Sequence, residues 1–138
     1  MICVKTKKGE KFELPIEYLK YSKKLLELHN ANGKEFTLDN IVKPNLFEHI
    51  VDFLKYYDAL DSYEFKVFKS IYVNPSFDIP SDKYQLSGYN ANLEENIDKL
   101  KRFSEKKLKQ MIGIVQYLEI QSLLEVITTI ISERMSNE

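Results

Sequence analysis

The sequence has little of what several classes of protein require. Cysteine occurs once in 138 residues, which excludes an internal disulfide framework and favours a reducing compartment. The four glycines lie at positions 9, 33, 88 and 113 and form no phosphate-binding loop. No apolar run approaches the roughly 18–20 residues that span a bilayer, and the amino-terminal segment turns polar too early for a signal peptide. We therefore expect a soluble protein of the cytoplasm or nucleus, with no membrane partner.

An excess of charge of one sign is also missing. Lys and Arg number 20, Asp and Glu 21, and the net charge is -1, which argues against whole-protein electrostatic binding to nucleic acid. Hydrophobic residues make up 43% of the chain and aromatic residues 12%, enough to build a core and too many for a wholly disordered chain. Because domains run roughly 100–200 residues, we expect a single domain over 1–138.

The first half of the chain alternates short strand patterns with helical ones. Two alternating runs on either side of Gly9 predict a β-hairpin, and Gly33 is placed to end the helix that follows. Pro44 suits the first turn of a second helix, where its missing N–H has no partner to lose. The expected order is a strand at 2–5, a strand at 11–14, a helix at 16–28, a strand at 35–38, and a helix that is capped by Asp39 or Asn40 and ends near 57.

The rest of the chain is predicted to hold a short helix, a long loop and two further helices. A short helix is expected near 62–70, and 72–96 is predicted to be a variable loop because it is rich in proline and asparagine and lacks periodicity. A helical pattern resumes at 97 and breaks near 117–121. The last helix is expected to begin with a capping box at 122–125. The predicted fold class is α/β (α+β), with three short amino-terminal strands, covering helices and two carboxy-terminal helices.

Residues that could carry catalysis are few and poorly placed for it. The two histidines, His29 and His49, have no cysteine or carboxylate at a metal-ligand or triad spacing. Cys3 lies in a predicted strand beside no obvious base, which is typical of an inert thiol. Carboxylate pairs such as Glu94 and Glu95 fall in the predicted loop. We therefore predict no enzyme activity, no catalytic residue, no metal and no cofactor.

One cluster of basic residues stands out between 99 and 109. Its members are Lys99, Lys101, Arg102, Lys106, Lys107 and Lys109. The pattern is typical of the solvated face of a helix whose apolar side holds Leu100, Phe103 and Leu108. A contact with nucleic acid or with an acidic partner is the less favoured interpretation. Aromatic side chains are not interleaved as single-stranded nucleic acid would require.

Several stretches resemble one family of adaptor proteins. Residues 2–5 (Ile-Cys-Val-Lys) and 9–14 (Gly-Glu-Lys-Phe-Glu-Leu) resemble the opening of that family, and 36–41 (Phe-Thr-Leu-Asp-Asn-Ile) resembles its entry to the next helix. The most specific match is 116–125, with Gln-Tyr-Leu-Glu-Ile and Leu-Leu-Glu where the family has Asn-Tyr-Leu-Asp-Ile and Leu-Leu-Asp. The family is that of the S-phase kinase-associated adaptor of SCF ubiquitin ligases and of elongin C, which have the BTB/POZ fold.

The resemblance implies an adaptor function without catalysis. Members of this family bridge a cullin and an F-box or SOCS-box-like substrate receptor in ubiquitin-dependent protein degradation. By this resemblance Gln116 and Tyr117 face the cullin. The receptor would bind an apolar helix surface that is left uncovered, made of Leu123, Leu124, Ile127, Ile130 and Ile131.

The chain also departs from the family pattern. The resemblance covers roughly 1–57 and 97–135 and fails over 58–96, and 99–109 is basic where the family is acidic. The family continues for two further helices that clasp the F-box, so a divergent and shortened member is expected.

Two other interpretations remain open. A BTB/POZ protein could homo-oligomerise as a scaffold or regulator, and light scattering would separate the two because an adaptor alone should be a monomer or a weak dimer. Alternatively, the 99–109 cluster could bind nucleic acid, in which case binding should fall steeply with salt.

Overall fold

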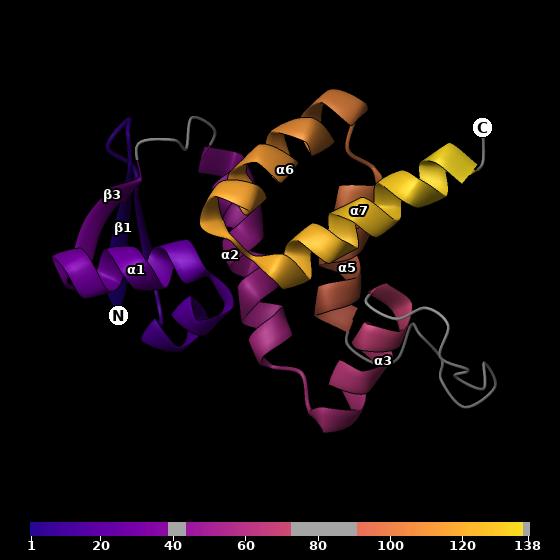
Figure 1. The fold of residues 1–138 in the computed structure, drawn as a ribbon, viewed down its shortest axis with the longest axis horizontal. Coiled ribbons are helices and arrows are strands. Elements are labelled where there is room, and N and C mark those ends of the chain that lie inside the picture. The colour runs from indigo at the N-terminus through magenta and orange to yellow at the C-terminus, as the bar shows by residue number, and fades with distance from the viewer. Residues whose placement is uncertain (39–43, 73–90, 137–138) are drawn as a thin grey trace.

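The chain folds into a small mixed sheet with a larger group of helices beside it (Figure 1). The computed structural model describes residues 1–38, 44–72 and 91–136. The elements are β1 (Ile2–Thr6), β2 (Lys11–Leu14), the 3-10 helix η1 (Ile16–Tyr21), α1 (Lys23–Asn32), β3 (Glu35–Leu38), α2 (Pro44–Asp58), α3 (Ser62–Tyr72), α5 (Ala91–Lys101), α6 (Glu105–Leu118) and α7 (Gln121–Ser136). The mixed α/β class is confirmed, with helices predominating.

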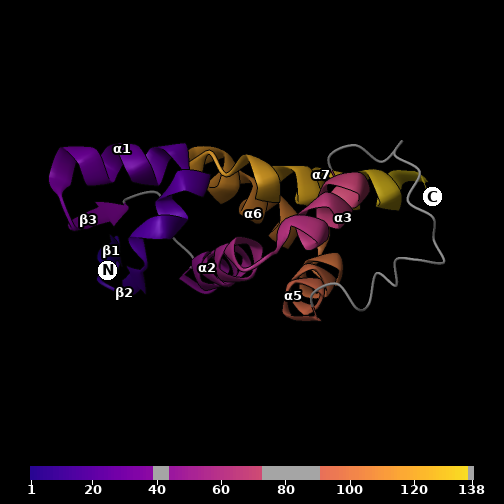
Figure 2. The ribbon, with the colours of Figure 1, turned by 90° about the horizontal axis from the view of Figure 1, so that it is seen from below.

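The three predicted strands form one sheet with the order β2-β1-β3. β1 pairs antiparallel with β2 through a turn in which Gly9 has a φ of 88°, and it pairs parallel with β3. A parallel partner cannot be reached through a tight turn, so the chain first crosses over through η1 and α1. Figure 2 shows α1 lying along one side of the strands.

Alternation along β1 gives the sheet one core face and one polar face. The core side holds Ile2, Val4 and Thr6, which are buried. Cys3 points to the opposite face, where it is partly exposed and pairs with Glu13 on β2 and Glu35 on β3. That the thiol is inert stays a prediction.

The helix predicted over 16–28 is wrong in its bounds, because it is two elements, η1 and α1. Ser22 at their junction has an extended backbone, with φ -129° and ψ 106°. Its hydroxyl accepts a hydrogen bond from the N–H of Leu25 at 3.2 Å, the preferred contact of an N-cap serine. α1 continues to Asn32, four residues beyond the predicted end, and stops before Gly33, which has a φ of 83°, a region that favours glycine.

The next two helices, α2 and α3, are joined by aromatic contacts. α2 begins at Pro44, and the short helix predicted near 62–70 is confirmed as α3. The ring centroids of Tyr57 on α2 and Phe68 on α3 lie 5.1 Å apart in an edge-on arrangement, which is a favourable geometry for aromatic pairs. The predicted caps of α2, Asp39 and Asn40, lie outside the described residues.

The predicted loop at 72–96 is too long at both ends. Tyr72 is the last residue of α3, and residues 91–96 are helical and belong to α5; positions 73–90 lie outside the described residues. The start of α5 is difficult to recognise in the sequence because Leu93 is the one large apolar residue among its first six residues. Its buried face is Leu93, Asn96, Ile97 and Leu100.

The predicted capping box at 122–125 is also wrong. α7 begins at Gln121, so the serine of the motif lies inside the first turn. The Nε2 of Gln121 donates to Oε1 of Glu125 at 3.2 Å. The glutamate therefore accepts from a side-chain amide, whereas in a capping box it would accept from the backbone N–H of the serine. A serine cap does occur one helix earlier, where Ser104 accepts from the N–H of Lys107 at 3.2 Å.

Packing of the helices buries most of the apolar side chains together. One cluster of buried hydrophobic residues extends from β1 to α7. α6 contacts both α1 and α2, and α7 contacts α3, α5 and α6. The junction of α6 and α7 is therefore joined to the sheet end of the molecule through α1.

Candidate partner-binding site

The predicted break near 117–121 is confirmed as a sharp turn between α6 and α7. α6 ends at Leu118, and Glu119 then adopts a left-handed conformation with φ 58° and ψ 48°. Its N–H donates to the carbonyl oxygens of Val115 and Gln116, which satisfies carbonyls that the helix end leaves open.

A buried serine fastens this turn to α1. The hydroxyl of Ser22 donates to the carbonyl oxygen of Leu118 at 2.5 Å while it accepts from the N–H of Leu25. Ser22 is fully buried, so both contacts are shielded from water. The turn that carries the family-like motif is thus held in a fixed position relative to α1.

The structure brings Gln116 and Leu124 together, although the sequence assigned them to different partners. Gln116 is exposed on α6, and Leu124 is half-buried on α7. Both line a hollow of about 190 Å³ at the α6–α7 turn, together with Val115, Glu119, Ile120 and Gln121. A side chain of a partner would meet an amide, a carboxylate and an apolar wall there.

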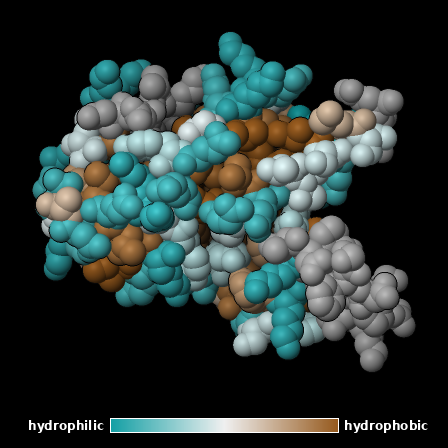
Figure 3. Space-filling model, viewed as in Figure 1, coloured by the Kyte–Doolittle hydropathy of each residue, from teal (hydrophilic) through white to brown (hydrophobic). Residues whose placement is uncertain are grey.

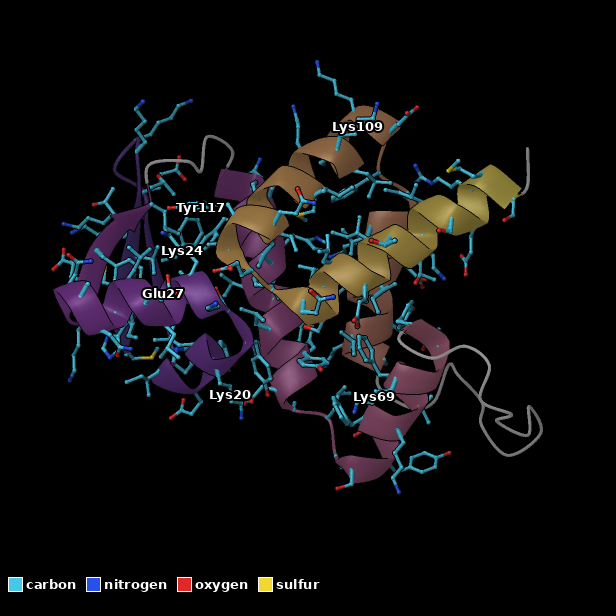
Figure 4. All side chains as sticks on the ribbon, viewed as in Figure 1. Lys20, Lys24, Glu27, Lys69, Lys109 and Tyr117 are labelled. Atoms are coloured by element: carbon cyan, nitrogen blue, oxygen red, sulfur yellow. The ribbon has the colours of Figure 1, made fainter. Side chains whose placement is uncertain are left out.

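Tyr117 has different neighbours from Gln116. Its ring is half-buried and lies near Lys24 of α1, with the Lys24 Nζ 5.6 Å from the ring centroid (Figure 4). A cation over an exposed aromatic ring is worth about 0.5–1 kcal/mol, so this contact orients Tyr117 at the α1–α6 junction. The two residues predicted to face one partner therefore lie beside different elements.

The expectation that the apolar stripe of α7 is uncovered is wrong for three of its five residues. Leu123 and Ile127 are 0% exposed and Ile130 is 2% exposed. α7 has neighbours on several sides, and these three side chains fill the space between them. Only Leu124 and Ile131 keep part of their surface in contact with solvent.

A second, narrower strip on α7 was missed. Leu124, Thr128, Ile131 and Met135 follow one another at steps of four, three and four residues, so they share one face of the helix. Met135 is 71% exposed. Figure 3 shows apolar surface where α6 and α7 lie side by side. The spacing alone could have separated this outer strip from the buried one.

The two histidines differ in their surroundings. His29 lies at the end of α1, where its Nδ1 is 2.9 Å from the carbonyl oxygen of Gly33. His49 is half-buried on α2, with its ring centroid 5.4 Å from that of Phe103. Asn96 of α5 donates through Nδ2 to the backbone oxygen of His49 at 3.3 Å. His49 thus lies at the interface between α2 and α5.

Acid is expected to destabilise the protein through His49. Burial lowers the pKa of His49 from its ordinary value, an effect that the charge of Lys99 reinforces and that of Asp52 opposes. Because the unfolded chain takes up this proton at about pH 6.5 and the folded chain only at lower pH, stability should fall as the pH drops below about 6.5.

The measurement is the thermal midpoint between about pH 7.5 and about pH 5.5. Other groups also titrate in this range, so the comparison is with His49→Gln, which keeps a polar side chain and cannot gain the charge. We expect a smaller fall in the variant. Equal falls in both proteins would contradict a role for His49.

Comparison with known proteins makes no assignment: no family model matches the chain, and no curated protein matches it. In the described ranges, none of the helices combines the length and apolar character needed to cross a membrane. The same ranges contain no group of three or more His, Cys, Asp or Glu side chains that could hold a metal ion.

Proposed function

We propose that the protein is a non-enzymatic adaptor of a cullin–RING ubiquitin ligase with a BTB/POZ-like fold. It bridges a cullin and an F-box or SOCS-box-like receptor. The observation that carries the proposal is the α6–α7 turn: the stretch most similar to the adaptor family, 116–125, forms a rigid corner with exposed side chains. The sheet order β2-β1-β3, with a parallel third strand after a helical crossover, supports the same assignment.

The cullin contact of this proposal is the outer surface of α6 near its end. Tyr117 offers a large half-buried ring with a polar tip, a combination that is enriched at interfaces. Gln116 adds an exposed amide one residue earlier. Because Ser22 fastens this end of α6, little ordering is needed when a partner binds.

The receptor contact is the outer strip of α7 defined by Leu124, Thr128, Ile131 and Met135. An amphipathic helix laid along it would place one apolar residue per turn against these side chains. Leu124 also lines the hollow at the turn, which gives such a helix a place for its terminal side chain. The buried residues Leu123, Ile127 and Ile130 support the strip from below and make no direct contact.

Replacing Tyr117 by alanine should weaken cullin binding by at least about 1 kcal/mol, the usual threshold for an important interface residue. The measurement is calorimetric titration with a panel of purified cullin amino-terminal domains. Tyr56→Ala is the matched control, because Tyr56 is also half-buried and has a lysine, Lys55, 5.8 Å from its ring centroid. Tyr56 lies on α2, away from the proposed cullin contact, so its replacement should leave the cullin affinity unchanged.

Three results would count against the adaptor proposal. The first is a wild-type protein that binds none of the cullins. The second is an equal loss of affinity in the Tyr117 and Tyr56 variants, which would indicate a general effect on folding. The third is a tight dimer in light scattering that Ile131→Asp disrupts, which would favour the homo-oligomerising scaffold.

A further inference from the structure

The turn between α5 and α6 carries basic residues that have no role in the proposed adaptor function. Arg102 lies in the turn between the two helices, and Lys106 and Lys107 lie in the first turn of α6. All three side chains are exposed. We call these three residues the basic corner.

The basic corner lacks carboxylate partners within the described parts of the chain. The neighbouring lysines do have them: Lys99 pairs with Glu95 at 4.0 Å and Lys109 pairs with Glu105 at 3.3 Å. Lysines in the first turn of a helix face its positive end, which is an unfavourable position for a cation. The basic corner therefore does not stabilise the helix on which it lies, and its charge is available to a ligand.

The corner is held in one shape by Arg134 of α7. Its Nη2 donates to the carbonyl oxygens of Lys101 at 2.6 Å and Phe103 at 2.7 Å, which lie on either side of Arg102. The Nζ of Lys107 lies 4.2 Å from the centroid of the Phe103 ring. A surface that is already ordered loses less conformational entropy when it binds a partner.

We propose that the basic corner docks an acidic segment of a partner protein. Residues 99–109 contain six basic residues and one acidic residue, a net charge of +5. A shallow hollow beside the corner is lined by Glu105, Lys106, Lys109 and Gln110, and Lys109 projects outward there (Figure 4). Carboxylates laid across this surface would meet several cations at once, and the interaction is independent of the adaptor proposal.

The surroundings favour a short acidic peptide over nucleic acid. The whole chain carries -1 and 99–109 carries +5, so the remaining residues carry -6 and would repel a long polyanion that extends past the corner. The aromatic ring of the corner, Phe103, is half-buried between Lys107 and His49. Because this ring is already partly covered, it is a poorer stacking platform for a base than an exposed aromatic ring would be.

The test is fluorescence anisotropy with a labelled glutamate decamer, a glutamine decamer and a short single-stranded RNA, at about 50 mM salt. The variant replaces Arg102, Lys106 and Lys107 by glutamine. The matched control replaces Lys7, Lys8 and Lys23 by glutamine, because these lysines are exposed and Lys23 also lies in the first turn of a helix. The control variant should melt at or above the wild-type temperature, since it removes a cation from a helix start. The corner variant also loses the contact of Lys107 with the Phe103 ring, which offsets that gain, so it should melt close to the wild-type temperature.

We expect the glutamate decamer to bind the wild-type protein, and the corner variant to bind it about tenfold more weakly, the size expected from losing three exposed ion pairs. The control variant should change the affinity by less than about twofold. The proposal is overturned if the decamer does not bind, or if the two variants lose affinity equally. It is also overturned if RNA binds more tightly than the decamer and depends on the same three residues.

Discussion

Ile127→Asp should unfold the domain rather than release a partner. Ile127 is 0% exposed and lies within the hydrophobic cluster that α7 shares with its neighbours. A carboxylate placed there loses its hydration among apolar side chains, and the apolar contacts of the isoleucine are lost as well. The loss of stability should exceed about 4 kcal/mol, a large part of the roughly 5–15 kcal/mol that stabilises an ordinary domain.

The control is Ile131→Asp, one helical turn further along α7. Ile131 keeps part of its surface in solvent, so its carboxylate remains hydrated and the loss should be about 1–2 kcal/mol, mainly from apolar area. Urea unfolding followed by circular dichroism measures both. If the two variants are equally stable, Ile127 is not part of the core. Receptor binding should therefore be examined with Ile131→Asp, because a partner cannot be tested on an unfolded domain.

Ser22→Ala should have the second-largest effect, about 2–3 kcal/mol. The substitution removes the N-cap of α1, which is typically worth about 1 kcal/mol. It also leaves the carbonyl oxygen of Leu118 without its hydroxyl donor in a buried place, and an unsatisfied buried acceptor costs about 1–3 kcal/mol. Both bonds share one hydroxyl, so the two losses should add incompletely, to about 2–3 kcal/mol.

Ser104→Ala separates these two contributions. Ser104 caps α6 with a similar bond of 3.2 Å, but it is exposed and its hydroxyl has no second role among the described contacts. Its replacement should cost only about 1 kcal/mol. Urea unfolding of both variants gives the difference, which measures the bond to Leu118. Equal losses would mean that this bond adds nothing to stability.

The sequence predicted the elements that local chemistry determines. Gly9 and Gly33 need a positive φ, and they mark the hairpin and the end of α1. The break after Leu118 was likewise visible. The division of 16–28 at Ser22 was not, because the partner of that serine, the carbonyl of Leu118, is 96 positions away in sequence. The start of α5 was missed because too few of its residues are apolar.

The break between α6 and α7 could be predicted from the sequence, whereas the burial of each α7 side chain could not. Periodicity identifies the apolar residues of α7, but a pattern cannot tell how many neighbours a helix has. Leu123 and Ile127 are covered because α7 packs against α3, α5 and α6, whereas Leu124 lies on the side that remains open. Nor could spacing predict that Tyr117 would lie against Lys24, because that contact depends on how α1 crosses the sheet.

The hydrogen bond from Ser22 to Leu118 also determines when the packing of α1 can be completed during synthesis. Ribosomes add roughly 5–20 residues per second, so the carbonyl that Ser22 needs is made some ~5–20 s after the serine itself. The hairpin and α1 are local and can form early. Until α6 has been made, however, the hydroxyl hydrogen of Ser22 can be donated only to water. The three strands, the last of which ends at Leu38, can pair well before this bond forms, so the bond is a late contact that fixes α1 against the end of α6.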